Sequence, residues 1–479
     1  MMTTDMSSRV SLGRSSCTFL ALLLLLAALG CGKYTSNAMN NPGGGGPAAT
    51  ANAQFRIGDG PADRVTSFEM SIGPVMLNPS SGAAISVLPK PQRVELSHLA
   101  GTTIPLATVN VPAGSYTSIT LTASNPEVTF INNLGQMMKI EPTVTQTVTV
   151  NFNPAVTIST SPVISLDLNL ASALTSDSQG NITGVNLSAA AFTLSTQPVA
   201  SDENNEQEES GKLEDVTGMV SSVNGSSFTM TVGQTGIALT FSTDSNTEFK
   251  DGASLSALAN MMVRVEGVTK ADGSMYAREV EGTGDENGMQ AAGLITNVSG
   301  NPATQITLLT QDGEGSGMDD SKVGAPMTID VTAAQYEVSS TSLDVSGLGT
   351  LPSLPNFPFD SSTVHAGQSV EVDSPSGMEG EAVGATKIRL QQQGLRGTVS
   401  GLSTSTSSGP VVFTLTVPAD SAFAMISGLT SVQVFWQAGT DLHDLDSVSN
   451  GQAIQVRGLV FFTGTGFNMI ARRIESGGN

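Results

Sequence analysis

The stretch TQTVTVNF, residues 145–152, alternates threonine or asparagine with valine and phenylalanine. Because successive side chains of a β-strand point to opposite faces, this period of two predicts a strand with one buried face. We expect the two valines and Phe152 to face a core, while the threonines and Asn151 face water. Comparable runs at turn-separated intervals predict a β-sandwich over residues 54–199. They lie at residues 65–72, 117–123, 163–170 and 189–194.

The composition of the whole chain agrees with an all-β protein. Charged residues make up 13% and aromatic residues 5% of the 479 residues, and 51 residues are glycine. Serine, threonine and valine alternate over short runs, which is typical of strands. Only residues 255–262 and 420–427 are candidates for short helices.

A repeat follows the predicted sandwich. Its three copies open with Gly218-Met219-Val220, Gly293-Leu294-Ile295 and Gly397-Thr398-Val399, and each closes with Ala-x-x-Val or Ala-x-x-Ile. An apolar strand before each close ends in Gly267 in the first copy and Gly458 in the third, but in Asp373 in the second. Several short strands in each copy predict three small β-barrel (OB-like) modules. Their expected bounds are residues 216–284, 290–392 and 393–476.

The N-terminus has the layout of a secretory signal peptide over residues 1–30. Arg9 and Arg14 precede an apolar run, residues 18–30, that is shorter than the roughly 20 residues of a membrane-spanning helix. Cys31 at the first mature position resembles the bacterial lipoprotein signal, in which that cysteine is lipidated. An ordinary cleaved signal is the alternative, and it would leave a lone thiol. The resemblance, with Gly32 after the cysteine, implies the outer membrane as the location.

Two further segments divide the chain. Residues 31–53 contain NNPGGGGP and are predicted to be a flexible tether. Residues 200–215 hold seven acidic residues and are predicted to be a solvated linker. The formal net charge of the chain is −22 and no basic stripe is visible, so we expect no nucleic-acid partner.

Few residues suggest chemistry. His98, His365 and His443 lie in three different units, which argues against a catalytic triad, and no catalytic motif or cofactor is expected. Asp312, Glu314 and Asp320 are weak candidates for calcium ligands, because position twelve of such a loop is Val323 instead of glutamate. A solvated acidic loop is the alternative here and at residues 279–287. Asp59 and Asp63 are either functional acids or ordinary turn residues. Trp436 is a weak candidate for glycan binding, against a core aromatic.

Two sequence segments carry a family resemblance. The first repeat copy, from GMVSSVNGSSFTMTV to DGSMYAREVEG, resembles a DUF5666-like domain of unknown function found in bacterial envelope lipoproteins. The N-terminal unit, with IGDGPA and VPAGSYTSITLT, resembles a DUF4382-like domain of such proteins. Neither resemblance implies an activity or catalytic residues.

These observations predict a lipoprotein of the cell envelope that is not an enzyme. Its expected role is non-catalytic binding or scaffolding, with the membrane contacted through Cys31 and with envelope proteins or glycans as partners. An envelope hydrolase that uses paired carboxylates is one alternative. A structural spacer, in which modules set a distance from the membrane, is another.

Overall fold

The computed structural model describes most of the chain after the tether. The described residues are 49–477 without residues 61, 180, 200–210, 234, 285–287, 316–317, 319, 339–342, 344, 346–347, 349–350, 352–355, 376–382, 404–409 and 444. The predicted signal peptide and Cys31 lie outside them. Within the described ranges, no helix is both long and apolar enough to cross a membrane.

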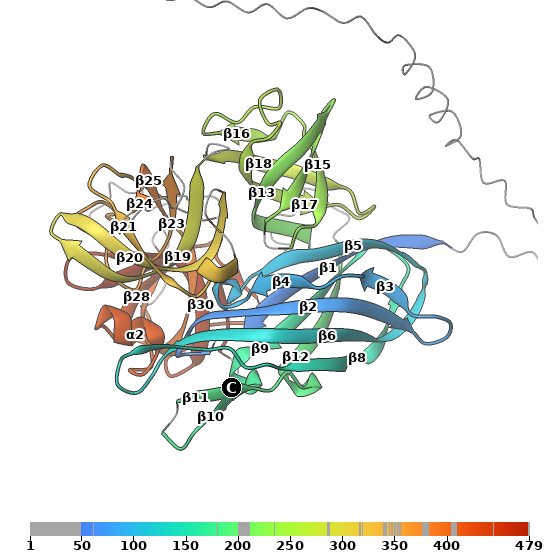
Figure 1. Ribbon diagram of the computed structural model, residues 1–479, viewed down its shortest axis with the longest axis horizontal. Helices are drawn as coiled ribbons and strands as arrows, with labels where there is room; N and C mark the ends of the chain where they lie inside the picture. The colour runs from blue at the N-terminus through green and yellow to red at the C-terminus, as the bar shows by residue number, and fades with distance from the viewer. Residues whose placement is uncertain are drawn as a thin grey trace, which may run out of the picture. The chain divides into compact units, whose positions relative to one another are not determined.

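The N-terminal unit is a sandwich of two sheets that share one hydrophobic core (Figure 1). A four-stranded sheet has the order β12-β9-β1-β5, and a second sheet has the order β3-β2-β6-β7 with β4 paired to β2 and β8 paired to β6. The first sheet consists of β1 (Thr50–Gly60), β5 (Thr103–Pro112), β9 (Pro162–Asn169) and β12 (Phe192–Pro198), and the second of β2 (Val65–Pro79), β3 (Ile85–Leu88), β4 (Gln92–Glu95), β6 (Gly114–Ile131), β7 (Met137–Ile140) and β8 (Thr145–Ile158). The connections contain η1 (Ser97–Leu99), α1 (Leu170–Ala173), β10 (Leu174–Ser176), β11 (Ile182–Val185) and η2 (Ala189–Ala191).

The alternation predicted for residues 145–152 is confirmed. Val150 and Phe152 of β8 are buried, whereas Thr147, Thr149 and Asn151 are exposed. The threonines pair across the outer face of the sheet with threonines of β6, so both faces of this strand are used.

Two predicted boundaries are wrong by a few residues. β1 begins at Thr50 within the predicted tether, because Ala51 and Ala53 are buried in the sandwich core. β13 begins at Lys212 within the predicted acidic linker, where Leu213 is buried. In both places the strand is stabilised by core contacts that local composition does not reveal.

The three repeat copies form sheets with the same strand order, and the all-β fold class is confirmed (Figure 1). The first has the order β15-β14-β13-β17-β18-β16 and the third β28-β27-β26-β30-β31-β29; parallel pairing of β15 with β18, and of β28 with β31, closes each sheet on itself. In the second copy, of order β22-β25-β23-β19-β20-β21-β24, the short β24 that precedes β25 makes the equivalent pairing with β21.

The first copy comprises β13 (Lys212–Asn224), β14 (Ser227–Val232), β15 (Ala238–Ser242), β16 (Glu248–Lys250), β17 (Met262–Thr269) and β18 (Met275–Gly284). The second comprises β19 (Met289–Gly300), β20 (Ala303–Gly315), η4 (Asp320–Lys322), β21 (Pro326–Asp330), β22 (Gln335–Val338), β23 (Ser369–Ser374), β24 (Val383–Gly384) and β25 (Lys387–Leu390). The third comprises β26 (Gln392–Ser400), β27 (Val411–Thr416), α2 (Ala422–Ser427), β28 (Ser431–Trp436), β29 (Asp441–Leu442), β30 (Ala453–Phe462) and β31 (Phe467–Ser476).

The two helix candidates differ in outcome. Residues 255–262 form turns and the start of β17, so no helix forms there. Residues 420–427 contain α2, which Ser421 caps by accepting a hydrogen bond from the Ala424 amide and which ends at Gly428.

The glycine that opens each copy is required by a close backbone approach. A Cβ at Gly218 would lie 2.1 Å from the Thr231 carbonyl oxygen, one at Gly293 2.0 Å from that of Leu309, and one at Gly397 2.5 Å from that of Thr416. No side chain fits at such distances, so the first strand of each barrel can pack against the second only with glycine there.

The place of Asp373 in the repeat is corrected by one residue. The pairing of Asp373 with Lys387 is equivalent to that of Arg457 with Arg473 in the third copy. Gly458, the glycine of the third copy, is the residue after Arg457 and pairs with Ala471. Ser374 therefore occupies the glycine place, and Asp373 occupies a half-buried polar place of the strand.

The same register brings three polar pairs to equivalent positions. Arg264 of β17 lies opposite Glu281 of β18 in the first copy, and Glu371 of β23 lies opposite Arg389 of β25 in the second. Gln455 of β30 lies opposite Glu475 of β31 in the third. The first copy has the arginine on the earlier strand and the glutamate on the later one, whereas the second copy has the opposite order. The arginine of each copy can therefore pair with the glutamate of the other.

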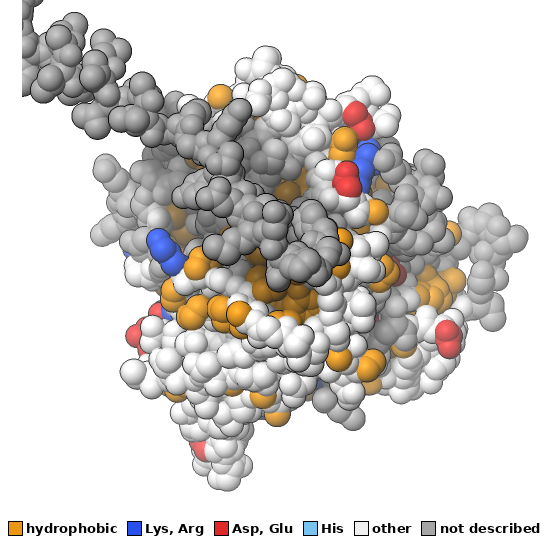
Figure 2. Space-filling view, turned by 90° about the vertical axis from the view of Figure 1, so that its right-hand side faces the viewer, with side chains coloured by type: hydrophobic (Ala, Val, Ile, Leu, Met, Phe, Trp, Pro, Cys, Tyr) orange, Lys and Arg blue, Asp and Glu red, His pale blue; other side chains and the backbone are white. Residues whose placement is uncertain are grey.

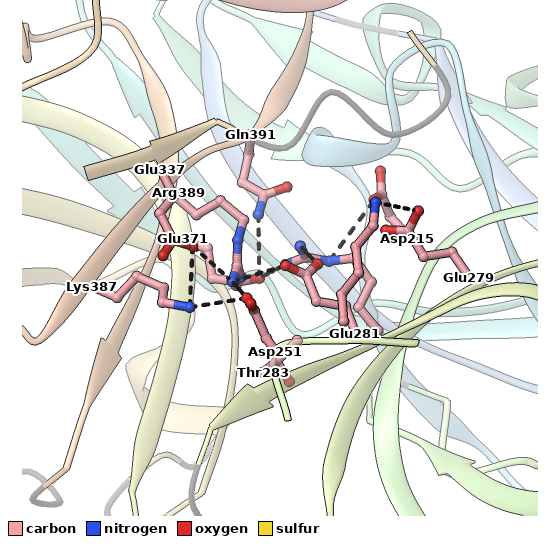
Figure 3. Close-up of polar contacts among 12 residues, drawn as sticks. Asp215, Asp251, Glu279, Glu281, Thr283, Glu337, Glu371, Lys387, Arg389 and Gln391 are labelled. Carbon is pink, nitrogen blue, oxygen red and sulfur yellow. Dashed lines mark hydrogen bonds and ion pairs between the residues drawn. The ribbon is translucent and has the colours of Figure 1, made fainter. Parts of the chain in front are cut away.

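That pairing forms a buried ion network between the first and second modules (Figure 3). Arg264 donates to both Glu281 and Glu371, and Arg389 contacts both Glu371 and Glu281, the latter at 3.1 Å. At the edge of the network, Asp251 accepts from Lys387 at 3.1 Å. Residues 279–284 of the segment predicted to be a solvated loop instead form the end of β18, and Glu281 lies there.

The charges of this network lie next to charges of opposite sign. Burial alone would lower the pKa of Arg264, but Glu371, Asp215 and Glu281 raise it overall. Burial alone would raise the pKa of Glu371, but the two arginines hold it below its ordinary value. Burial raises the pKa of Glu281 overall, although Arg264 and Arg389 oppose the shift. Each of the four central groups has partners of opposite charge.

Removing one arginine should destabilise the protein strongly. For Arg264→Met we expect a loss of about 3–5 kcal/mol in unfolding free energy, because Glu281 and Glu371 would lose a buried counter-charge. Urea denaturation followed by circular dichroism measures it. The matched control is Arg278→Met on β18, whose side chain is 32% exposed and reaches only Asp244, at 3.7 Å; we expect less than about 1 kcal/mol there. Equal effects of the two variants would contradict this account.

Asp373 should make stability depend on pH. Burial and the nearby Glu371 raise its pKa from 3.8 to about 6, against the opposing effects of Arg389, Gln290 and Lys387. The protonated form is thus favoured in the folded state, so its contribution is full below pH 3.8 and is lost as pH rises through about 6. We expect Asp373→Asn, which stays neutral, to gain stability relative to the unaltered protein between pH 4 and 7. Urea midpoints across that range measure this gain, and parallel pH profiles would refute the assignment.

Candidate functional site: a polar cavity between the sandwich and the third module

The third copy turns its equivalent polar pair toward a cavity instead of a neighbouring repeat. This cavity has a volume of about 820 Å³ and is lined by β1, β9 and β12 of the sandwich and by β26, β30 and β31 of the third module. Ligand pockets of small molecules typically measure about 300–1,000 Å³. Gln455 and Glu475 are both among its lining residues.

Arginines of the third module fix the cavity in place. Arg457 donates to the carbonyl oxygens of His98 at 3.1 Å and Ala100 at 3.0 Å, and Arg473 donates to that of Gly101 at 3.1 Å. Gly101 has a φ of +75°, and a Cβ there would lie 3.3 Å from the Gln455 amide nitrogen. The hydrogen bonds that its carbonyl oxygens accept from these arginines thus hold the loop after η1 against β30 and β31.

Strand alternation places polar groups on the sandwich wall. In β9 the even-numbered Ile164, Leu166 and Leu168 are buried in the sandwich core. The intervening Ser165 and Asp167 line the cavity. Gly58 of β1 lies beside Asp167. A Cβ atom at this position would lie 3.2 Å from an Asp167 carboxylate oxygen, so the glycine leaves room for that carboxylate.

Two carboxyl groups at this end of β1 and β9 have raised pKa values. Asp59, at the end of β1, is 4% exposed. Burial raises its pKa well above the ordinary value, and the carboxylates of Asp167 and Glu95 raise it further, while the Leu170 backbone amide opposes the shift. Burial also raises the pKa of Asp167. Asp59 lies opposite the core residue Leu168 and Asp167 lies opposite Gly58, so the two side chains lie on opposite faces of the sheet.

Several buried polar atoms at the cavity have no hydrogen-bond partner among the described residues. Among them are the Nη2 atom of Arg56 in β1 and the Nε2 atom of Gln455 in β30. Arg56, Asp59 and Gln455 are each more than nine-tenths buried and all line the cavity. Buried polar groups in folded proteins are nearly always satisfied, so such a concentration indicates a place where water or a ligand binds.

A smaller cavity of about 120 Å³ adjoins the first. Asp59 and Arg396 line both cavities, so these two residues stand at their junction. The side chain of Arg396 of β26 forms no hydrogen bond or ion pair in the part of the chain that the structure describes. It opposes the rise in the pKa of Asp63 that burial causes. The junction thus combines a guanidinium group with a buried carboxyl group.

At the rim, Asp441 accepts from the Nε atom of Arg473 at 3.0 Å. The ring of His443 lies 4.0 Å from the same carboxylate and is 47% exposed. His98 contacts Glu95 at 2.6 Å, and His365 packs on Phe462 with ring centroids 3.9 Å apart. The three histidines have separate surroundings and do not meet in one site.

The sequence singled out part of this cavity. Asp63 is a turn residue, as its alternative interpretation predicted, but Asp59 is a buried strand residue and not a turn residue. Arg56, Asp167, Arg396 and Gln455 were missed. The alternation in VISLDLN does indicate that Asp167 leaves the core, but no sequence signal places it beside Asp59.

The other candidate residues lie elsewhere. Trp436 is half-buried at the end of β28 and packs against the core of the third module. Asp312 and Glu314 lie within β20, which pairs with β19, so the prediction of a loop at these two residues is wrong. Asp320 begins η4, and the side chains of Glu314 and Asp320 are outside the description. Among the described residues, no group of three or more His, Cys, Asp or Glu could hold a metal ion.

The comparisons with known proteins give families without an assigned function. Residues 50–189 match the family described as "Domain of unknown function (DUF4382)", and residues 217–281 match "Domain of unknown function (DUF5666)". A search of curated proteins gives no match. A solved structure titled "drosophila Unr CSD456" aligns at 11% identity over 54% of this chain and 95% of its own, with a TM-score of 0.13, which is too low to support an argument.

These matches agree with the resemblances drawn from the sequence. Asp59 and Asp167 fall inside the first matched range, whereas Arg396, Gln455 and Arg473 fall outside both. The cavity is thus formed by a matched domain together with the third repeat copy. The chain therefore carries an N-terminal DUF4382 domain, over residues 50–189, followed by a DUF5666 domain over residues 217–281.

Proposed function

We propose that this protein is a lipid-anchored envelope protein that binds a small polyhydroxylated ligand, a glycan unit, without altering it chemically. The observation that supports the proposal is the cavity of about 820 Å³ with its unsatisfied buried polar atoms. Hydroxyl and amide side chains suited to sugar hydroxyls line the sandwich wall, among them Ser165, Asn169, Thr193 and Ser195. No Phe, Tyr or Trp ring of the described residues lines it, so recognition would depend on hydrogen bonds and charge.

The packing of the modules favours binding over a role as a spacer. Gln311 of the second module donates to the Thr66 carbonyl oxygen of the sandwich at 2.8 Å, and Arg472 of the third module donates to Glu214 of the first at 2.6 Å. Modules that fold back on one another would be a poor way to set distance. On the face shown in Figure 2, the described Lys and Arg side chains are few and separate, which offers no polyanion-binding stripe.

A second candidate function is hydrolysis of a glycosidic bond by carboxyl groups of the cavity. The raised pKa of Asp167, which lines the cavity, favours it, because one carboxyl group of such an enzyme must stay protonated. Incubating the purified protein with the glycans that it binds distinguishes the two. Recovery of intact glycan supports binding alone, and shortened products support hydrolysis.

The binding role is tested by filling the cavity. We expect Thr193→Trp, on the cavity side of β12, to weaken the binding of a glycan found on a glycan array by at least about tenfold, because the indole would occupy the ligand's space. The matched control is Thr147→Trp, on the exposed face of β8, which should leave the affinity unchanged. Isothermal titration with the full-length protein in detergent measures both. Equal affinities, or no glycan bound by the unaltered protein, would refute the proposal.

The lipid anchor has its own test. We expect Cys31→Ser to move the protein from the membrane fraction to the soluble fraction of cells, because the acylated thiol would be lost. Cys17→Ser lies within the predicted signal peptide and should leave the protein in the membrane fraction. Sedimentation and immunoblotting measure the distribution, and a Cys31→Ser protein that still sediments with membranes would refute lipidation as the anchor.

A further inference from the structure

The cavity is lined by a buried arginine that indicates one feature of the ligand. This inference deepens the proposed function and depends on it. Arg56 of β1 is 6% exposed and lines the cavity. Its neighbours Phe55 and Ile57 lie in the sandwich core. Because side chains alternate along a strand, Arg56 projects from the opposite face of the sheet, which is the cavity wall.

The guanidinium group of Arg56 is only partly satisfied. Its Nε atom donates to the side-chain oxygen of Gln54 at 2.8 Å. Its Nη2 atom is buried and has no hydrogen-bond partner among the described residues. A buried donor without an acceptor is costly, and more so when it is charged.

The other buried arginines show what Arg56 lacks. Arg264 and Arg389 each contact two glutamates. Arg472 donates to a glutamate of the first module at 2.6 Å, and Arg457 donates to two backbone carbonyl oxygens. Arg56 is about as buried as these arginines, yet the acceptor described for it is a neutral amide.

The charges around Arg56 do not compensate it. Burial lowers its pKa to about 10; Glu214 opposes this shift and Arg473 adds to it. Glu214 accepts from Arg472, and the nearest carboxylate described for Arg473 is its own partner Asp441. An anion bound beside Arg56 would favour its charged form, as the glutamates do for Arg264.

Two serines lie in the same row of the sheet as Arg56. Ser165 of β9 is next to Arg56 in the parallel register, and Ser195 of β12 is next to Ser165. All three residues line the cavity. Neighbouring strands lie about 4.8 Å apart, so one guanidinium group and two hydroxyl groups present donors to the same part of the cavity.

We propose that the ligand is an acidic sugar, a uronic acid, and that Arg56 binds its carboxylate while Ser165 and Ser195 donate to the same end of the sugar. The planar guanidinium group matches the two oxygens of a carboxylate. A single negative charge fits better than the double charge of a phosphate, because Asp167 and Glu475 also line the cavity. A neutral sugar would leave Arg56 without a counter-charge.

The test compares sugars that differ only at the carboxyl group. Oligosaccharides of glucuronic, galacturonic and mannuronic acid are screened beside their carboxyl-reduced forms, in which a neutral hydroxymethyl group replaces the carboxylate. The acid that binds best and its reduced form are then titrated into the full-length protein in detergent. We expect the acid to bind at least about tenfold more tightly, because the reduced form loses the charged hydrogen bonds to Arg56. Equal or reversed affinities, or binding of neutral sugars alone, would overturn the inference.

Variants assign the preference for the acid to Arg56. Arg56→Gln keeps a donor but removes the charge, and it should abolish the preference. The control Arg278→Gln on β18, whose side chain is 32% exposed and reaches Asp244, should keep it. Arg396→Gln, at the junction of the two cavities, should also keep it. A preference that persists in Arg56→Gln, or that falls equally in Arg396→Gln, would overturn the assignment.

A second variant supplies the missing counter-charge from the protein and serves if Arg56→Gln fails to fold. Ser165→Asp places a carboxylate beside Arg56 on the neighbouring strand, so the guanidinium group would be occupied and the preference lost. The matched control is Ser165→Asn, which has nearly the same size without the charge and should keep the preference. Retention of the preference in Ser165→Asp would contradict the proposed carboxylate site.

The outcomes separate this inference from the proposed function. Equal binding of an acid and its reduced form, lost in Thr193→Trp, would overturn the carboxylate site and leave glycan binding intact. Absence of any glycan binding would overturn both.

Discussion

The rest of this structure depends on the ion pairs and hydrogen bonds that buried arginines form at the contacts between modules. Arg264 and Arg389 join the first and second modules through Glu281 and Glu371, and Arg457 joins the third module to the sandwich. A buried ion pair gains little over an apolar contact, but breaking one is costly. Their effect is therefore to specify which module faces touch. The cavity exists because the third module is held against the loop after η1.

The repeat reuses one pair of strand positions for two purposes. In the first two copies the pair carries opposite charges in reversed order, and the modules neutralise each other. In the third copy the pair is Gln455 and Glu475, and the facing surface is the sandwich wall with Ser165 and Asp167. Mutual ion pairs at the first contact mark a structural interface, and the polar cavity at the second contact marks a candidate binding site. The same backbone supports both, because strand register fixes position and leaves side-chain chemistry free.

Much of the fold could be predicted from particular residues. The valines of TQTVTVNF predict the buried face of β8, and the glycines Gly218, Gly293 and Gly397 mark the strand that opens each barrel. Less of the site could be predicted. Asp59 was noticed only as one of two acids near a turn, and the acidic run after Glu279 suggested solvent, although Glu281 is 8% exposed. Local composition cannot reveal a partner that comes from a distant part of the chain.

Sequence by itself determined the strand periods, the repeat and its glycine places, because these follow from the alternation of side chains and from backbone clearance between adjacent strands. It also determined the signal-like N-terminus on which the proposed lipid anchor is based. Only the tertiary structure decided which charges are compensated. Arg264 meets Glu371 across 107 positions of sequence, whereas the carboxyl group of Asp167 lies at the cavity and forms no ion pair with a described side chain. Electrostatic energy depends on distance in space and on burial, and neither quantity is written in the order of residues.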